Sequence, residues 1–203
     1  MRDKAFGQDY KQTIVDKFGI YLSVRRVLIA VEKIKKPVAC LEIGCGYYAK
    51  LLRELLPYVD SAVGIDVTIS DDLKKNEKLL FIESNAEDAL EKIKDKKFDL
   101  ILMINVVEHL NEPLQILKKS YELLNDKGIL LVNVPTWRGK FFLELAAFKL
   151  GASPKYEMDD HKMYYDKKDL WPLLVKAGFK PSNINIEYHK FGLNIFSEAL
   201  KSD

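Results

Sequence analysis

The chain has 203 residues, 48% of them hydrophobic, and its 32 basic and 30 acidic residues leave a formal net charge of +2. This size and composition predict a single folded domain, residues 1–203, and argue against a disordered chain or a nucleic-acid partner. No apolar run approaches the roughly 18 residues of a membrane span, and two cysteines together with a polar, charged beginning favour a cytoplasmic protein.

The first predicted element is helical. From Gln8 to Lys35 apolar residues recur at steps of three and four, which is typical of a helix, and Gly19 marks a possible break into two. Pro37 ends this pattern. We therefore expect residues 1–36 to form an N-terminal helical cap.

Short apolar runs and helical patterns then alternate along the chain. Such alternation predicts parallel strands joined by right-handed crossovers, and the continuously apolar strands predict a sheet covered on both faces. The expected fold is therefore a doubly wound, Rossmann-like α/β sheet with helices on both faces. The predicted strands are 37–43, 61–67, 78–84, 98–105 and 128–135, and the predicted helices are 48–56, 85–94 and 112–124.

The rhythm changes after Pro135. A helix is predicted over 166–179, and the runs 183–190 and 192–200 are close enough to form an antiparallel hairpin, which completes a seven-stranded, mostly parallel sheet at one edge. Residues 137–165 are expected to be an insertion on the substrate side. Its apolar segment 140–150 leaves three alternatives open: a lid over the pocket, a peripheral membrane contact, and a helix that only packs.

The turn after the first strand carries the chemistry. A strand that ends in Gly44-Cys45-Gly46 and enters a helix lets the backbone approach a ligand closely. The spacing G-x-G-x-x-A, with Asp66 about 20 residues later, also fits a nicotinamide dinucleotide site. Glu42 favours a different ligand, because a carboxylate there repels phosphates and attracts an ammonium group, which S-adenosylmethionine carries.

Several motifs together resemble the class I S-adenosylmethionine-dependent methyltransferases. LEIGCG is similar to the cofactor turn of that family, VGIDVT to its ribose strand, SNAEDA to its adenine loop, and FDLILMINVVEHL to its fourth strand. The resemblance runs from about Lys35 to the C-terminus. Within this family, the chain resembles the small-molecule group, which includes ubiquinone-pathway and glycan or natural-product methyltransferases.

The resemblance implies S-adenosylmethionine as the cofactor and a role for each matching position. Glu42 would hold the methionine ammonium, the glycine turn would pass its backbone close to the cofactor, and Asp66 would take the ribose hydroxyls. The implied cofactor-binding residues are Glu42, Gly44, Cys45, Gly46, Asp66, Val67, Asn85, Ala86, Glu87, Asn105 and Val106.

The implied reaction is methyl transfer to an oxygen or nitrogen of a small molecule, such as a sugar or lipid-linked intermediate. His109 and His161 are the candidate catalytic bases. Metal-using relatives carry E-x-x-E-H where this chain has Asn105 in place of the first glutamate, so no metal is expected. A nicotinamide-dependent oxidoreductase and a non-catalytic methyltransferase-like binding module remain the alternatives.

Overall fold

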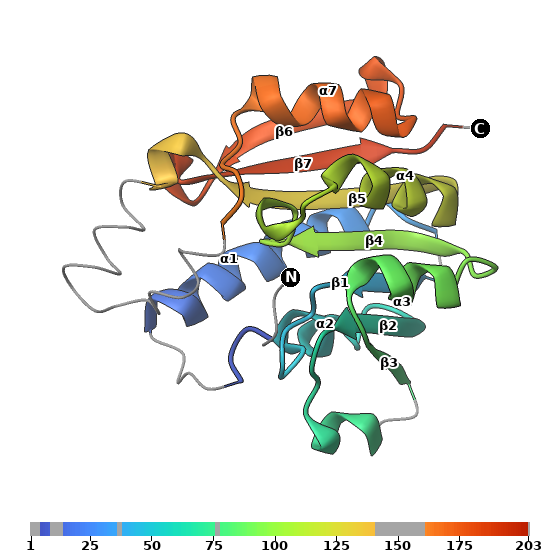
Figure 1. Ribbon diagram of the computed structural model, residues 1–203. Coiled ribbons are helices and arrows are strands. Elements are labelled where there is room, and N and C mark those ends of the chain that lie inside the picture. The colour runs from blue at the N-terminus through green and yellow to red at the C-terminus, as the bar shows by residue number, and fades with distance from the viewer. Residues whose placement is uncertain (1–4, 9–13, 36–37, 76–77, 141–160, 203) are drawn as a thin grey trace.

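The computed structural model describes residues 5–8, 14–35, 38–75, 78–140 and 161–202. Within this part of the chain seven strands form one sheet in the order β3-β2-β1-β4-β5-β7-β6 (Figure 1). Neighbouring strands run parallel from β3 to β5, and β7 is antiparallel to both β5 and β6. The strands are β1 (Ala39–Ile43), β2 (Ser61–Asp66), β3 (Leu79–Glu83), β4 (Phe98–Ile104), β5 (Leu124–Pro135), β6 (Ile184–His189) and β7 (Asn194–Leu200).

This topology confirms the predicted fold class. The two C-terminal strands form the antiparallel hairpin expected at the sheet edge. The reversed strand is β7, which lies one place inside the edge, while β6 forms the edge itself.

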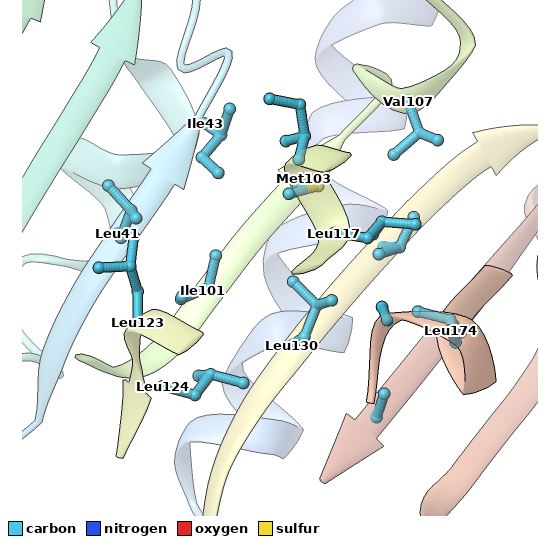
Figure 2. Close-up of a cluster of buried hydrophobic side chains, with 14 of the residues drawn as sticks. Leu41, Ile43, Ile101, Met103, Val107, Leu117, Leu123, Leu124, Leu130 and Leu174 are labelled. Carbon is cyan, nitrogen blue, oxygen red and sulfur yellow. The ribbon is translucent and has the colours of Figure 1, made fainter. Parts of the chain in front are cut away.

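Helices cover both faces of the sheet because the strand side chains alternate between two apolar clusters. In β4, Ile101 and Met103 pack on one side, and Leu100 and Leu102 on the other (Figure 2 shows part of the first cluster). The first cluster includes side chains of α3 (Ala86–Lys92), α4 (Pro113–Leu123) and α7 (Lys167–Ala177), and the second includes side chains of α1 (Ile14–Val31) and α2 (Lys50–Leu55).

The possible break at Gly19 does not occur. Helix α1 is continuous from Ile14 to Val31, and the Ser23 hydroxyl donates to the Gly19 carbonyl oxygen at 3.0 Å. A glycine inside a helix costs about 1 kcal/mol relative to alanine, and the burial of Val27 and Ala30 against the sheet offsets this cost.

Two sequence predictions fall largely outside the described residues. These are the substrate-side insertion 137–165, of which 141–160 are not described, and the membrane contact through 140–150. Among the helices of the described ranges, none combines the length and the apolar character needed to cross a membrane.

The carboxyl ends of the parallel strands meet at one edge of the sheet, and backbone hydrogen bonds tie them together. The Gly44 amide donates to the Ile65 carbonyl oxygen at 2.7 Å, and the Asn105 amide donates to that of Asn133 at 2.8 Å. In a doubly wound sheet this edge is where ligands bind.

Candidate functional site

A cavity of about 560 Å³ opens at this edge. Every residue that the sequence analysis assigned to cofactor binding or catalysis lines it, although these residues come from segments far apart in the chain. Their individual roles stay predictions. The lining residues among them are Glu42, Gly44, Cys45, Gly46, Asp66, Val67, Asn85, Ala86, Glu87, Asn105, Val106, His109 and His161.

The glycine turn requires both of its glycines. Gly44 and Gly46 have φ values of 74° and 75°, in the left-handed region that favours glycine. A Cβ atom on Gly44 would lie 2.3 Å from Cγ2 of Val106, which follows β4, so a larger residue here would force one of the two segments to shift. The Gly46 amide also donates to Oδ2 of Asp66 at 2.7 Å, which joins the turn to the end of β2.

Glu42 is an acid in a nearly closed environment. Its side chain is 3% exposed, and within the described chain Oε2 has no hydrogen-bond partner. Burial raises the pKa of this carboxyl well above its usual value; the nearby Asp66 raises the pKa further, while a backbone hydrogen bond from Leu52 opposes the shift. Two acids side by side in a buried site favour a ligand that brings positive charge.

Asp66 is held in place by the backbone. Its Oδ2 atom accepts from the Gly46 amide and its Oδ1 atom from the Val67 amide at 2.8 Å. A carboxylate oxygen can accept a second hydrogen bond. The side chain is therefore fixed and can still accept hydrogen bonds from a ligand hydroxyl.

Cys45 is not an activated nucleophile. Burial raises the pKa of its thiol well above the usual value, and the charges of Glu42 and Asp66 raise it further. A thiol in such surroundings stays protonated. Its contribution to the site is as a small residue in the turn.

Asn85 has a local structural task at the start of α3. Its Oδ1 atom accepts from the Asp88 amide at 2.8 Å, which caps the helix. This bond fixes the loop of Asn85, Ala86 and Glu87 at the cavity wall.

The two candidate bases, 52 positions apart in the sequence, lie together. The ring centroids of His109 and His161 are 4.8 Å apart, and His161 Nδ1 lies 2.9 Å from the Tyr164 hydroxyl. His109 ends the short 3-10 helix η2 (Val107–His109), and the backbone amide of Lys162 donates to the Glu108 carbonyl oxygen at 2.7 Å. This backbone contact brings the segment that carries His161 to the end of β4.

Glu108 completes a group with ligand atoms of the kind that metals use. One ligand atom from each of Glu108, His109 and His161 lies within 4.8 Å of the other two. Metal–ligand bonds of about 2.1 Å in a tetrahedral site place ligand atoms roughly 3.4 Å apart, so these side chains would have to close around an ion. The carboxylate of the buried Glu108 also acts on Tyr165, whose pKa rises to about 12 through burial, Glu108 and Asp169.

Sequence reasoning did not find the remaining walls of the cavity. Phe18 and Ser23 reach it from α1, and Lys190 and Phe191 reach it from η4 (Lys190–Gly192), the turn between β6 and β7. The φ values of Lys190 and Phe191 are 48° and 60°, which is unusual for residues other than glycine. The sequence predicted the helix and the hairpin that carry these residues, but it did not predict that either would line the cavity.

Trp137 is not among the residues that line the cavity in the described part of the chain. Its ring packs against that of Tyr164, with centroids 5.7 Å apart, and Lys140 Nζ lies 5.9 Å from the centroid of the Trp137 ring.

Comparison with known proteins identifies the family of the chain. A family model described as a methyltransferase domain matches residues 16–183. The ubiquinone biosynthesis O-methyltransferase of Pelagibacter ubique (strain HTCC1062) is 33% identical over 128 residues, which cover 60% of this chain and 49% of that protein. The chain thus spans about half the length of this curated relative.

Two solved structures illustrate the shared fold. A SAM-dependent methyltransferase from Archaeoglobus fulgidus superposes with a TM-score of 0.67 at 18% identity, covering 90% of this chain and 94% of that one. A Thermotoga maritima protein, described as a SAM-dependent methyltransferase and possible histamine N-methyltransferase, has a TM-score of 0.61 at 18% identity, covering 93% and 96% of the two chains.

Proposed function

Because the chain belongs to the methyltransferase domain family, whose cofactor is S-adenosylmethionine, we propose that it transfers the sulfonium methyl group to an oxygen or nitrogen of a small molecule. A sugar or a lipid-linked intermediate is the kind of acceptor we favour. One observation carries the proposal: the acids, the glycine turn and a histidine pair line the same cavity. The relative named as an O-methyltransferase supports the same class of reaction.

The cofactor half of the cavity is assigned to the residues around the glycine turn. Glu42 would accept hydrogen bonds from the methionine ammonium, since its buried carboxylate gains most from a cation. Asp66 would accept from the ribose hydroxyls, and the loop of Asn85, Ala86 and Glu87 would frame the adenine. The backbone of Asn105 and Val106 would lie against the methionine end.

The reaction itself needs little more than alignment. The acceptor's lone pair forms the new bond to the methyl carbon while the carbon–sulfur electrons pass to sulfur, so the sulfonium becomes a neutral thioether. Holding the two atoms in line at near-attack distance therefore supplies most of the catalysis. A base is required only if the acceptor must lose a proton.

His161 is the base we favour, with His109 beside it. For Nε2 of His161 to accept a proton, Nδ1 must carry hydrogen and donate to the Tyr164 hydroxyl, and the 2.9 Å contact allows this. We therefore expect His161→Ala to lower transfer to a hydroxyl by about 100-fold, the lower end of what a general base contributes.

The test is a transfer reaction with a labelled donor. Purified protein is incubated with S-adenosylmethionine carrying a carbon-13 methyl group and a small-molecule extract, and labelled products are separated. The proposal predicts a labelled small molecule that appears with the wild type and, where the acceptor is a hydroxyl, is greatly reduced with His161→Ala. The nicotinamide alternative predicts no label transfer but a change in nicotinamide absorbance, and a non-catalytic module predicts neither.

The same reaction decides whether a metal takes part. Glu108, His109 and His161 would be its ligands. A reaction that proceeds unchanged after exhaustive dialysis against a chelator supports the histidine base, whereas loss of turnover that zinc or magnesium restores supports a metal-assisted version.

The wider setting of the reaction is also proposed. We take residues 1–203 as one domain, with 1–36 as the helical cap and 137–165 on the substrate side. Phe18 and Ser23 of α1 line the cavity, which supports the assignment of the helical cap. A cytoplasmic location is favoured as well. Cell fractionation with a tagged protein tests it.

A further inference from the structure

Three asparagines, two of which line the cavity, are joined by their side chains. Asn105 follows β4, Asn133 lies in β5 and is completely buried, and Asn194 begins β7 and is 9% exposed. The Nδ2 atoms of Asn133 and Asn194 both donate to Oδ1 of Asn105, at 2.8 Å and 3.2 Å. Asn105 therefore has its side-chain carbonyl held from two directions.

The backbone helps to hold Asn105 there. Its φ is 56°, a left-handed conformation that asparagine adopts more readily than most residues, and its amide donates to the Asn133 carbonyl oxygen. Strained backbone of this kind persists where the surroundings fix it, and it gathers at functional sites.

This arrangement fixes which end of the Asn105 amide faces the ligand. Because Oδ1 points to the two buried donors, Nδ2 points away from them, and Asn105 is an exposed residue of the cavity wall. Within the described chain Nδ2 makes no hydrogen bond.

The reverse orientation would be costly. If the Asn105 amide were rotated, the side chain of the fully buried Asn133 would have to rotate as well to keep a hydrogen bond between them. The NH₂ group of Asn133 would then occupy the position of its present Oδ1, where there is no hydrogen-bond partner within the described chain. Buried N–H groups without partners are rarer in proteins than buried carbonyl oxygens without partners. The network therefore favours the orientation with the Asn105 carbonyl inward.

The position of this amide is between the two halves of the site. Asn105 is followed by Val106, which packs against Gly44 of the cofactor turn, and by η2, which carries His109. With the cofactor held as proposed, an N–H donor at this point would face the region where the acceptor meets the methyl group.

We propose that Asn105 donates a hydrogen bond from Nδ2 to the nucleophilic atom of the acceptor and so makes the site selective for hydroxyl over amino acceptors. The inference rests on the proposed function and narrows its substrate class. A hydroxyl oxygen has two lone pairs: one accepts from Nδ2, and the other forms the bond to the methyl carbon.

The electron and proton movements balance for an oxygen acceptor. As the carbon–oxygen bond forms, the carbon–sulfur pair passes to sulfur, and the acceptor's own proton passes to the histidine. A neutral amine has one lone pair, which it needs for the attack, and its N–H groups would face the N–H groups of Asn105. Unpaired polar groups in a closed site are a strong means of rejection.

Asn105→Asp tests this with almost no change in shape. One carboxylate oxygen can accept from Asn133 and Asn194 as before, and the other places an acceptor where the donor was. We expect transfer to oxygen to fall by at least about 30-fold, and the ratio of N-methyl to O-methyl products to rise. Asn105→Ala, which removes the donor without adding charge, should lose oxygen transfer without that rise.

The products are compared by their carbon-13 methyl signals, which differ between O-methyl and N-methyl groups. Asn185→Asp, the same substitution at an exposed position on β6, should keep the wild-type ratio. Calorimetry with S-adenosylhomocysteine shows whether Asn105→Asp still forms the cofactor site. Wild-type N-methyl products, or wild-type transfer to oxygen by Asn105→Asp, would overturn the proposal.

A second measurement needs no turnover and therefore separates this inference from the proposed function. In nitrogen-15 spectra of the wild-type protein with S-adenosylhomocysteine, the side-chain amide protons of Asn133 should exchange with solvent at least about 10-fold more slowly than those of Asn105. Slow exchange at Asn105 would show that its amide points inward, and the selectivity argument would fail. Absence of any methylated product with the expected exchange pattern would instead count against the proposed function.

Discussion

Replacing Glu42 by glutamine should make the cofactor-free protein more stable and its cofactor binding weaker. Glu42 is 3% exposed, with a pKa raised by burial and by Asp66, so its ionised form is disfavoured in the folded chain. Glutamine has nearly the same shape and can still accept the hydrogen bond from the Leu52 amide. The substitution removes the charge and leaves the packing.

The gain in stability should grow with pH. A carboxyl whose pKa is higher in the folded than in the unfolded state binds its proton more tightly when folded, so the free energy of unfolding falls as pH rises between the two pKa values. The stability advantage of Glu42→Gln is therefore small near pH 4.5 and complete above the folded pKa. A buried polar group without a full set of partners costs about 1–3 kcal/mol, and each kcal/mol corresponds to about 2–4 °C in Tm for a chain of this size.

Cofactor binding should change in the opposite direction. Loss of a charge-assisted hydrogen bond to the methionine ammonium weakens binding by about 1–3 kcal/mol, or roughly 5- to 150-fold. Urea denaturation at several pH values measures the free energy of unfolding, and calorimetric titration measures the affinity for S-adenosylmethionine. Glu54→Gln, on the exposed side of α2, is the matched control and should change neither.

A Glu42→Gln protein that is less stable than the wild type at high pH would show that the acid serves the fold. Unchanged affinity for S-adenosylmethionine would show that Glu42 does not contact the ligand. Either result refutes the assignment of this residue.

Three further substitutions test two residues of the site and one residue of β6. Asp66→Ala should weaken S-adenosylhomocysteine binding by about 1–3 kcal/mol in calorimetry, and an unchanged affinity would mean that the end of β2 does not touch the cofactor. Gly44→Ala should destabilise the protein by about 2–4 kcal/mol in urea denaturation, because the left-handed φ and the 2.3 Å approach to Val106 both oppose a Cβ atom; wild-type stability would contradict this. The pKa of His189 is lowered from 6.5 to about 4 by burial and by the charges of Lys190 and Arg26. As the pH drops from 6.5 to about 4, the imidazole is therefore protonated in the unfolded chain before it is protonated in the folded chain, and the free energy of unfolding falls. His189→Gln should remove about 1–2 kcal/mol of that fall, allowing for partial exposure, and an unchanged pH slope would show that His189 titrates normally in the folded protein.

The fold could be predicted because its signals are local. Alternating apolar runs and helical periodicity fix the order of the elements, and the nearness of the last two runs fixes the hairpin. Helix α1 does not break at Gly19, because one glycine lowers helix propensity only slightly. The packing of α1 on the sheet, which is not a local signal, keeps the helix continuous.

The candidate site divides in the same way. Glu42, Asp66 and Asn105 could be placed at one edge because the carboxyl ends of parallel strands always share an edge. The meeting of His109 with His161, and the asparagine network from Asn105 to Asn194, depend on contacts between segments tens of residues apart. No periodicity or spacing along the chain encodes such contacts.

The central claim is that the residues gathered in this cavity form one binding site for S-adenosylmethionine, and calorimetry of the wild-type protein tests it most directly. Separate titrations with S-adenosylmethionine, S-adenosylhomocysteine and NAD are compared under one buffer condition. The account predicts saturable one-site binding of the first two and no detectable heat from NAD. Binding of NAD with no response to either S-adenosyl compound would contradict it.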